Sequence, residues 1–509
     1  MNSKIYNTFT YLFFFVIISF YIISVQDISR HWTSNFDMEL LISYNSILYM
    51  SGLNQEYLDH PTSIFFIIHS IFLKFLNLIN FFEIKNLNQL NNENNSINED
   101  LNNLIYWTRY FNIFLCTSFA IIFFKILRHK FDYIIALTFT LIFLFSATFL
   151  DQASQVRSEL LCVLFIFIAI NFLTKFLENK KRNLNLFLFF IFVYLSVFMK
   201  NQIMFYIPLL ILIPLYVINL EQKLIYENNG YKFLDKKFFL FSFYIFIILL
   251  ILIFANKNYA TLQSKIFLIG FYLYLNLVFI LYLFFLKSNF TRNLFLFNGI
   301  LLASTSLFFI ILLLHPSTNG VSQKLFNFMG IKFYSNIPSD VDNITWIFNF
   351  LDKFFTVIPV SINSIFFEIK DYTLLIYILI GFTLLNFKRL DKKILFSIFL
   401  VILFVLFSKI IINFRYDAIR YDIFFQPFLI YMLVEVLSKI KKKNTIYLLS
   451  IIILLSTFSI NKDMIFNQQH PKDRINLFCS EVSNGYLDTW HKNLSKNKIK
   501  KFCISKEKS

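Results

Sequence analysis

Long apolar runs, separated by short polar connectors, make up most of the chain. Many of these runs hold about 18 or more residues, enough to cross a hydrocarbon core of about 30 Å as a helix. Their polarity does not alternate as it would in the strands of a membrane barrel. The pattern predicts an all-α integral membrane protein with about thirteen transmembrane helices. The predicted spans are residues 7–25, 105–127, 133–150, 158–177, 185–199, 203–219, 238–255, 266–286, 293–314, 373–387, 393–412, 422–438 and 445–460.

Residues 62–82 form one more apolar run, and the charge of the connectors decides its place. This run carries His69 and Lys74 and leads into an Asn-rich, acidic stretch at 86–103. Short cytoplasmic loops are rich in Lys and Arg. If 62–82 lies along the outer membrane surface and the N-terminus is inside, nearly every basic connector faces the cytoplasm. These connectors are residues 125–130, 180–182, 232–237, 287–292, 388–393 and 439–443. We therefore predict a juxtamembrane helix on the outer face and a C-terminus outside.

Two long segments and the tail are predicted on the outer face. The polytopic domain covers residues 1–460, with a first outer loop at 26–106 and a second long outer loop at 315–372. The tail at 461–509 is polar and basic, and about 50 residues bury little core by themselves. We predict that it forms a short extracytoplasmic cap rather than an independent domain.

The four cysteines divide into two pairs by their surroundings. Cys116 and Cys162 fall inside apolar runs, where a free cysteine acts as a small packing residue. Cys479 and Cys503 lie in the polar tail. If the tail faces an oxidising compartment, these two are expected to form a disulfide that closes the cap.

Composition and charge support a membrane protein and argue against a nucleic-acid partner. The chain is 57% hydrophobic and only 15% charged, with a mean hydropathy of +0.63, and a soluble protein of this size needs more charge. The net charge of +17 would suggest nucleic acid in a soluble protein. Here the basic residues gather in the connectors, where they orient the chain in the membrane.

The first outer loop carries two acids two residues apart, Asp37 and Glu39. A carboxylate directly after a membrane span can accept a proton from a hydroxyl group, or help to hold a divalent metal ion. A structural interpretation is also open, in which Asp37 places its charge near the first turn of an amphipathic helix at 38–50.

A second polar cluster follows at Asp59, His60 and Pro61. Pro61 suits the first turn of the helix at 62–82 and Asp59 suits its cap, which explains two of the three residues without any function. His60 could ligate a metal ion together with a carboxylate. The candidate metal ligands are therefore Glu39, Asp59 and His60, and a divalent metal ion is the one candidate cofactor.

Several cations are predicted on the outer face, at the ends of different spans. They are Arg157, Lys200, Arg415 and Arg420. A guanidinium group can grip a phosphate through two hydrogen bonds, so a converging set would suit an anionic lipid headgroup. Each cation alone also fits a structural role, because Arg157 can pair with Glu159 and the others can anchor a span at the interface.

Several common site motifs are missing. The sequence has no Walker loop, dinucleotide-binding glycine pattern, HExxH or GxSxG. The centres of the predicted spans are nearly free of Asp, Glu, Lys and Arg. Ion-coupled transporters and proton pumps usually need such groups at mid-membrane depth, so this pattern disfavours a transporter.

Four stretches of the sequence carry a resemblance to a known family: FDME in the first outer loop, DHPTSIFFIIHSIFLKF ahead of and within 62–82, WTRYFNIF at the next span, and RYDIFFQP late in the chain. They resemble the GT-C glycosyltransferases, polytopic enzymes that take a sugar from a polyprenyl-phosphate donor. The likeness is greater to the branch of protein O-mannosyltransferases and bacterial aminoarabinose transferases that modify lipid A. It covers residues 7–460. Thr62 stands where that branch often has a second proline, and the Asn-rich insertion at 86–103 is unusual for it.

The resemblance implies a role for each of these polar residues. Asp37 takes the position of the catalytic acid and Glu39 that of the accessory acid, while Arg157 and the late arginines contact the donor phosphate. The implied enzyme serves cell-envelope glycan biosynthesis on the outer face of a bacterial cytoplasmic membrane. Its partners are a polyprenyl-phosphate-linked sugar donor, a lipid, glycan or protein acceptor, and membrane lipids. The alternatives are a lipid-linked glycan polymerase, ligase or flippase and, from another class, a transporter.

Overall fold

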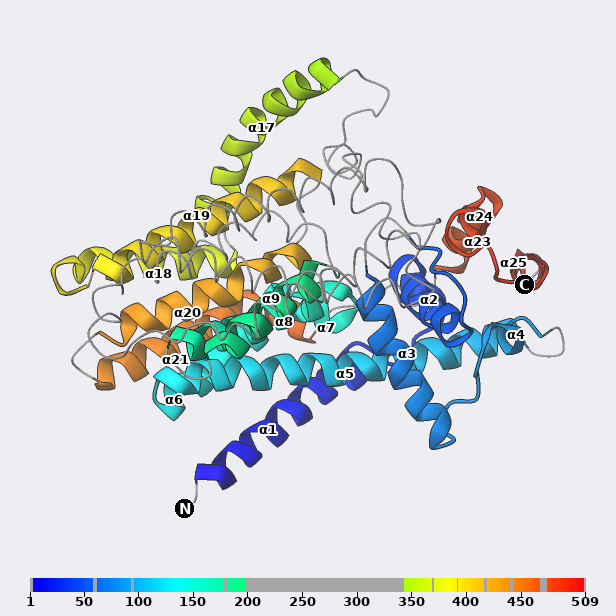
Figure 1. The fold of residues 1–509 in the computed structure, drawn as a ribbon, viewed down its shortest axis with the longest axis horizontal. Coiled ribbons are helices and arrows are strands. Elements are labelled where there is room, and N and C mark those ends of the chain that lie inside the picture. The colour runs from blue at the N-terminus through cyan, green and yellow to red at the C-terminus, as the bar shows by residue number, and fades with distance from the viewer. Residues whose placement is uncertain are drawn as a thin grey trace, which may run out of the picture. The chain divides into compact units, whose positions relative to one another are not determined.

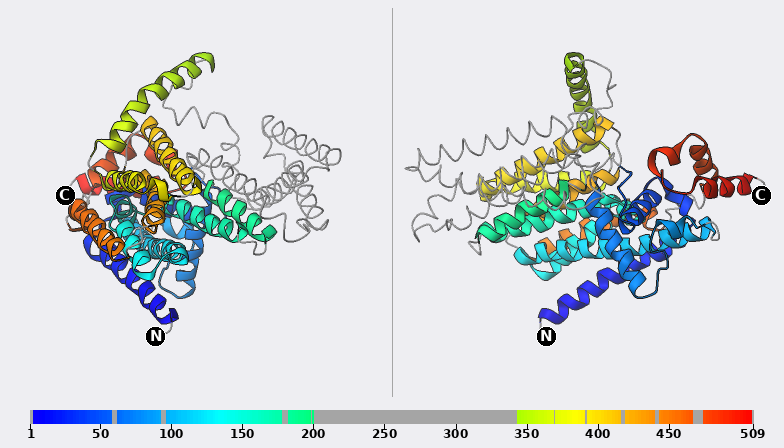
Figure 2. Two further views of the ribbon diagram at one scale, coloured as in Figure 1. Left: turned by 90° about the vertical axis from the view of Figure 1, so that its left-hand side faces the viewer. Right: turned by 45° about the vertical axis from the view of Figure 1, so that its right-hand side comes forward.

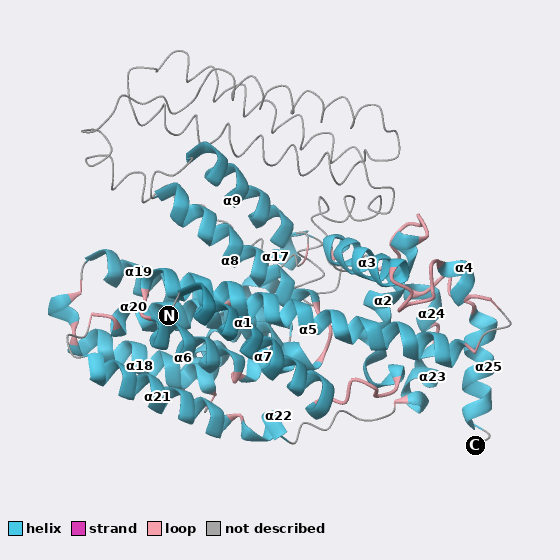
Figure 3. Ribbon diagram, turned by 90° about the horizontal axis from the view of Figure 1, so that it is seen from below, coloured by secondary structure: helices cyan, strands magenta, loops and turns pink. Residues whose placement is uncertain are grey.

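The computed structural model describes residues 3–57, 62–92, 96–177, 182–197, 199, 343–368, 370–390, 392–415, 419–439, 443–466 and 474–507. Every regular element among these residues is a helix, and none of them is a strand (Figures 1 and 3). The chain divides into two compact units. One contains Met1–Ile47, Ile68–Val163 and Met329–Ser509, and the other contains Leu48–Ile67 and Leu164–Phe328.

The helices of the described residues follow the apolar runs of the sequence. In the first half of the chain they are α1 (Ser3–Phe20), α2 (Leu41–Met50), α3 (Ser63–Leu78), α4 (Leu87–Leu90), α5 (Ile97–Lys130), α6 (Tyr133–Leu144), α7 (Ala147–Ser154), α8 (Ser158–Leu177) and α9 (Arg182–Val197). In the second half they are α17 (Asn343–Phe366), α18 (Asp371–Leu385), α19 (Lys392–Arg415), α20 (Gln426–Leu437), α21 (Lys443–Ile460), α22 (Lys462–Phe466), α23 (Ile475–Ser483), α24 (Tyr486–Trp490) and α25 (Lys496–Glu507).

Four helical segments among the described residues are long and apolar enough to cross a membrane. They are Ile5–Val25, Ile97–Lys130, Ser158–Phe176 and Lys443–Ile460, and they correspond to the predicted spans 7–25, 105–127, 158–177 and 445–460. The apolar helices support a membrane-associated protein built from helices.

The predicted span at 133–150 is a bent pair of helices. Tyr133–Leu144 and Ala147–Ser154 meet at an angle of 62°, so they form either a broken span or a re-entrant loop. The break has a local cause, because the Ser146 side chain accepts a hydrogen bond from the Phe149 N–H and starts a new helix.

The other predicted spans either correspond to shorter apolar helices or lie outside the described residues. The predicted spans at 185–199, 373–387, 393–412 and 422–438 correspond to the shorter apolar helices Leu184–Ser196, Asp371–Leu385, Val401–Ile410 and Gln426–Leu437. The juxtamembrane prediction at 62–82 coincides with α3. The spans at 203–219, 238–255, 266–286 and 293–314 lie outside the described residues. The total of about thirteen spans and the assignment of sides stay predictions.

Helix α5 is the central element of the larger unit. It packs against α1 on one side and α6 on the other, and α6 in turn packs against α20 and α21 (Figures 1 and 2). Its charges match the helix dipole, with Glu99 and Asp100 in the first turn and Arg128, His129 and Lys130 in the last.

Aromatic rings fill the core around α5. Phe119 and Phe123 of α5 contact Phe143 of α6, with ring centroids 5.1 and 5.3 Å apart. On the other side Phe124 meets Phe14 of α1 edge to face at 5.8 Å. All five side chains are almost completely buried, so α5 contributes two packing faces to the core.

In the smaller unit, α9 and the part of α8 from Leu164 onward pack against each other. Ala169, Leu173 and Phe176 form one apolar cluster with residues of α9, which are Leu186, Phe189, Phe190 and Val193. The α9 residues recur at intervals of three and four, so they lie on one helix face.

A side chain from another part of the chain binds each end of the short helix α7. At its start, Asp371 Oδ2 accepts a hydrogen bond from the Ala147 N–H at 3.1 Å. At its end, Arg30 donates to the Ser154 carbonyl at 2.7 Å. The Asp371 oxygen pairs with a backbone N–H that has no partner within the helix, and the Arg30 cation at the C-terminus also stabilises the helix dipole. Because an eight-residue helix is marginal alone, these contacts fix α7 in place.

A buried ion pair lies beside α7. Lys409 Nζ of α19 is 2.7 Å from Asp422 Oδ1, and both side chains are almost fully buried. Asp422 belongs to the 3₁₀ helix η8 (Ile419–Phe424), which packs against α7. The same Nζ is 5.0 Å from the centre of the Tyr372 ring, close enough for a cation–π contact.

We predict that this ion pair behaves as one unit. Lys409→Met leaves Asp422 as a buried charge without its cation, and should lower the free energy of unfolding by about 3–5 kcal/mol. Adding Asp422→Leu should restore most of that loss, because the double variant removes both charges. Thermal unfolding in detergent, followed by tryptophan fluorescence, measures both. A single variant as stable as the unmodified protein would contradict the prediction.

Candidate functional site

The acidic motif lies in a tightly wound loop between α1 and α2. The loop contains the π-helical turn η1 (Tyr21–Val25), the 3₁₀ helix η2 (Trp32–Asn35) and a second π-helical turn η3 (Phe36–Leu40). The backbone of Asp37 is in η3, and its side chain lies outside the described residues. Glu39 is in the same turn and is completely buried.

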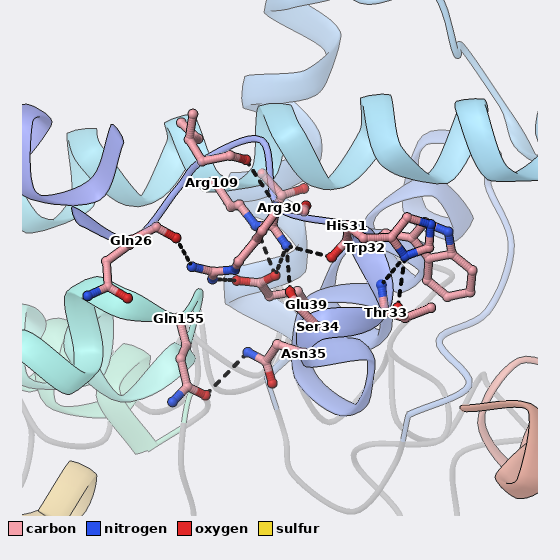
Figure 4. A network of polar contacts seen from close by, with 12 residues as sticks. Gln26, Arg30, His31, Trp32, Thr33, Ser34, Asn35, Glu39, Arg109 and Gln155 are labelled. Carbon is pink, nitrogen blue, oxygen red and sulfur yellow. Dashed lines mark hydrogen bonds and ion pairs between the residues drawn. The ribbon is translucent and has the colours of Figure 1, made fainter. Parts of the chain in front are cut away.

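Two arginines hold the Glu39 carboxylate between them (Figure 4). Arg30 Nη2 donates to Oε1 at 2.9 Å. Arg109 Nη2 and Nε donate to Oε2 at 2.8 and 3.1 Å. We call Arg30, Glu39 and Arg109 the Glu39 clamp. Both oxygens of the carboxylate are engaged by charged donors, and such hydrogen bonds are about twice as strong as neutral ones.

The clamp arginines also bind the backbone of the loop. Arg109 Nη1 donates to the carbonyls of Ile28, at 3.0 Å, and of Arg30. Arg30 Nη1 donates to the Gln26 carbonyl at 2.8 Å. Buried carbonyls need donors, and here the two guanidinium groups supply them. The loop is therefore wrapped around the clamp.

Glu39 stays ionised inside the clamp. Burial alone would raise its pKa, but the charges of Arg109 and Arg30 outweigh that effect and hold the pKa below its usual value. Its contribution to stability is present above the ordinary carboxyl pKa of about 4.3 and is lost only as the pH falls through the lowered folded value. This arrangement favours an anchoring role for Glu39 over the predicted accessory-acid or metal role.

Arg157 is brought close to the acidic turn through one glutamine. Its Nε and Nη2 donate to Gln155 Oε1 at 3.1 and 2.9 Å. The same oxygen accepts from Asn35 Nδ2 at 3.2 Å, and Asn35 is two residues before Asp37. The alternative pairing is present as well, because Arg157 Nη1 is 3.9 Å from Glu159 Oε1.

The other predicted site residues are placed only in part. Arg415 ends α19 and Arg420 lies in η8, and both side chains are outside the described residues. Lys200, Asp59 and His60 lie wholly outside them. Within the described ranges, no group of three or more His, Cys, Asp or Glu side chains could hold a metal ion.

The two arginines of the clamp were not among the site residues predicted from the sequence. Arg109 stands inside WTRYFNIF, at the start of a long apolar run. A charge in such a run needs a partner, because an unpaired buried charge is very unfavourable. That signal could have pointed to an acid in the first loop. Arg30 and Gln155 lie in polar stretches, where nothing in the sequence distinguishes them.

Comparison of the chain with family models, curated proteins and solved structures gives no match. The GT-C resemblance therefore stays a prediction that depends on four short stretches of the sequence.

We predict that Arg109 cannot be replaced by lysine. Arg109→Lys keeps a positive charge near Glu39 but loses the guanidinium nitrogens that bind the carboxylate and the backbone carbonyls. Each buried group left without a partner costs about 1–3 kcal/mol, so the melting temperature should fall clearly in detergent. The control is Arg128→Lys in the same helix, whose exposed side chain donates to the Phe131 carbonyl. Equal, small effects of both variants would contradict the clamp.

Proposed function

We propose that the protein is a membrane glycosyltransferase, which moves a sugar from a polyprenyl-phosphate-linked donor to an acceptor hydroxyl on the outer face of a bacterial cytoplasmic membrane. The observation that carries the proposal is the chain of contacts from Arg157 through Gln155 to Asn35. It brings a candidate phosphate-binding cation near the turn that carries the candidate base, Asp37.

The reaction divides the work between one carboxylate and several cations. Asp37 accepts the proton of the acceptor hydroxyl, whose oxygen attacks the anomeric carbon of the sugar. The bond between that carbon and the lipid phosphate breaks from the opposite side, so the configuration inverts. The lipid phosphate leaves with the electron pair, and nearby cations stabilise its charge. Arg157 is the first of these cations, and Lys200, Arg415 and Arg420 are further candidates.

The clamp explains how a loop could hold a catalytic base with precision. Glu39 is two residues after Asp37, and its ion pairs fix the η3 backbone from the buried side. A preformed position for the reacting groups removes much of the entropic barrier to reaction. In this proposal Glu39, Arg30 and Arg109 are positioning residues.

Cations from the chain, rather than a metal ion, carry the leaving-group charge in this proposal. Of the three candidate metal ligands, only Glu39 is described, and both of its oxygens are taken by arginine donors. The described residues therefore do not fit a metal site, and no step is assigned to one.

Removal of the Asp37 carboxylate tests the proposal. In Asp37→Asn the base is lost while the side chain keeps nearly its shape, so transfer should fall by at least about 100-fold, the lower range for general base catalysis. The melting temperature should stay unchanged. The assay follows a radiolabelled polyprenyl-phosphate sugar incubated with membranes.

The matched control is Asp27→Asn in the same loop. Asp27 is exposed, and its carboxylate accepts hydrogen bonds from its near neighbour Ser29. Asparagine also tolerates the left-handed backbone found there, φ 51°. This variant should transfer sugar normally. Full transfer by Asp37→Asn would end the assignment of Asp37 as the base.

A further inference from the structure

Residues 474–507 belong to the C-terminal tail and are called the cap from here on. A row of aromatic contacts joins the cap to the loop that carries the acidic motif. Trp32 of η2 meets Phe478 of α23 edge to face, with ring centroids 4.7 Å apart, and Phe502 of α25 at 5.6 Å. Phe36 of η3 meets Phe478 at 5.2 Å and Tyr486 at 5.5 Å. Edge-to-face aromatic pairs of this kind favour one geometry as well as burial.

Polar contacts attach the cap to the same loop. Tyr486 Oη donates to the carbonyl of Phe36 at 3.3 Å, and Phe36 is the residue directly before Asp37. Asn493 N donates to Tyr44 Oη at 3.1 Å, and Tyr44 is seven residues after Asp37 in the chain. The cap therefore contacts the chain both before and after Asp37.

His491 completes the contact between the cap and the α2 segment. It is fully buried, and its ring lies 4.8 Å from Tyr44 and 5.1 Å from Tyr486. Burial lowers the pKa of His491 to about 3, so the ring is neutral at pH 7 and packs as an uncharged group between the two tyrosines.

A disulfide joins the two cap helices that contact Trp32. Cys479 follows Phe478 in α23, and Cys503 follows Phe502 in α25. The bond predicted from the sequence is therefore present, and each cysteine is next to a ring of the aromatic row. The cap helices have only 9, 5 and 12 residues, lengths at which an isolated helix is marginal. The cap depends on this cross-link and on its contacts with the loop.

We propose that the disulfide-closed cap is part of the candidate site, in which Phe478 and Tyr486 are positioning residues that hold η3, and hence Asp37, through contacts separate from those of the Glu39 clamp. Reduction of the bond between Cys479 and Cys503 frees α23 from α25 and releases the turn. The catalytic meaning of this arrangement depends on the proposed function, whereas the mechanical coupling of cap and turn does not.

Hydrogen exchange tests that coupling without an activity assay. The full chain in lipid nanodiscs is incubated in deuterated buffer with and without a membrane-permeant reductant. Deuterium uptake by peptides covering 31–41 is then followed by mass spectrometry. Reduction should raise their exchange rate at least about tenfold, because they lose one of their two supports. Peptides of α21 (443–460) should not change. Treating the folded, oxidised protein avoids any failure of a variant to fold.

Two sets of variants make the test specific. Cys479→Ser with Cys503→Ser should exchange like the reduced protein, and reductant should have no further effect on it. Tyr486→Phe keeps the ring but loses the hydrogen bond to the Phe36 carbonyl, so it should raise exchange less than Tyr486→Leu. If reduction raises the exchange rate of the cap peptides but leaves that of peptides 31–41 unchanged, the proposal is overturned, because the cap then moves independently of the turn.

An activity measurement separates this inference from the proposed function. If transfer is detected, Tyr486→Leu should lower kcat and leave the KM for the lipid donor unchanged, because the donor phosphate is assigned to Arg157. A loss confined to KM would contradict a positioning role. If the unmodified protein transfers no sugar but exchange still depends on the disulfide, the proposed function fails and the coupling stands.

Discussion

A buried carboxylate between two guanidinium groups is the interaction on which the described part of this protein depends. Glu39 links Arg30 of the first loop to Arg109 of the central helix, 70 residues away in the chain. Two cations and one anion leave an excess of positive charge, and the carbonyls of Gln26, Ile28 and Ser154 face it. The cluster therefore fixes loop backbone, α5 and the end of α7 through one set of contacts.

A similar constraint holds at two other buried polar sites among the described helices. Lys409 is paired with Asp422, and Asp371 is surrounded by the donors Ala147 N, Gln426 Nε2 and Asn461 Nδ2. In surroundings of low polarity, each of these groups needs a hydrogen-bonding or charged partner, and the partner must lie at a well-defined distance and angle. Apolar contacts between helices are not directional. A few polar contacts therefore fix the positions of these helices relative to one another.

Most of the described helices could be predicted from the sequence, but the candidate site could be predicted only in part. Apolar length is a local property, so four predicted spans match long helices of the structure. The break at Ser146 was missed, although a serine in an apolar run is a possible helix cap. The clamp could not be derived, because the partners of Glu39 come from distant places and only Arg109 stood out by its surroundings. The cap disulfide was predicted from cysteine placement, but its contact with the acidic loop was not.

The most direct test of this account is the stability of Glu39→Gln. Glutamine keeps the size of the side chain but removes the one negative charge between two buried arginines, which should cost about 3–5 kcal/mol of unfolding free energy. The matched control, Glu83→Gln, changes an exposed acid of the same segment, residues 26–106, and should leave stability unchanged. Unfolding of both variants in detergent gives the answer. If Glu39→Gln is as stable as Glu83→Gln, the clamp does not hold the loop and the account is wrong.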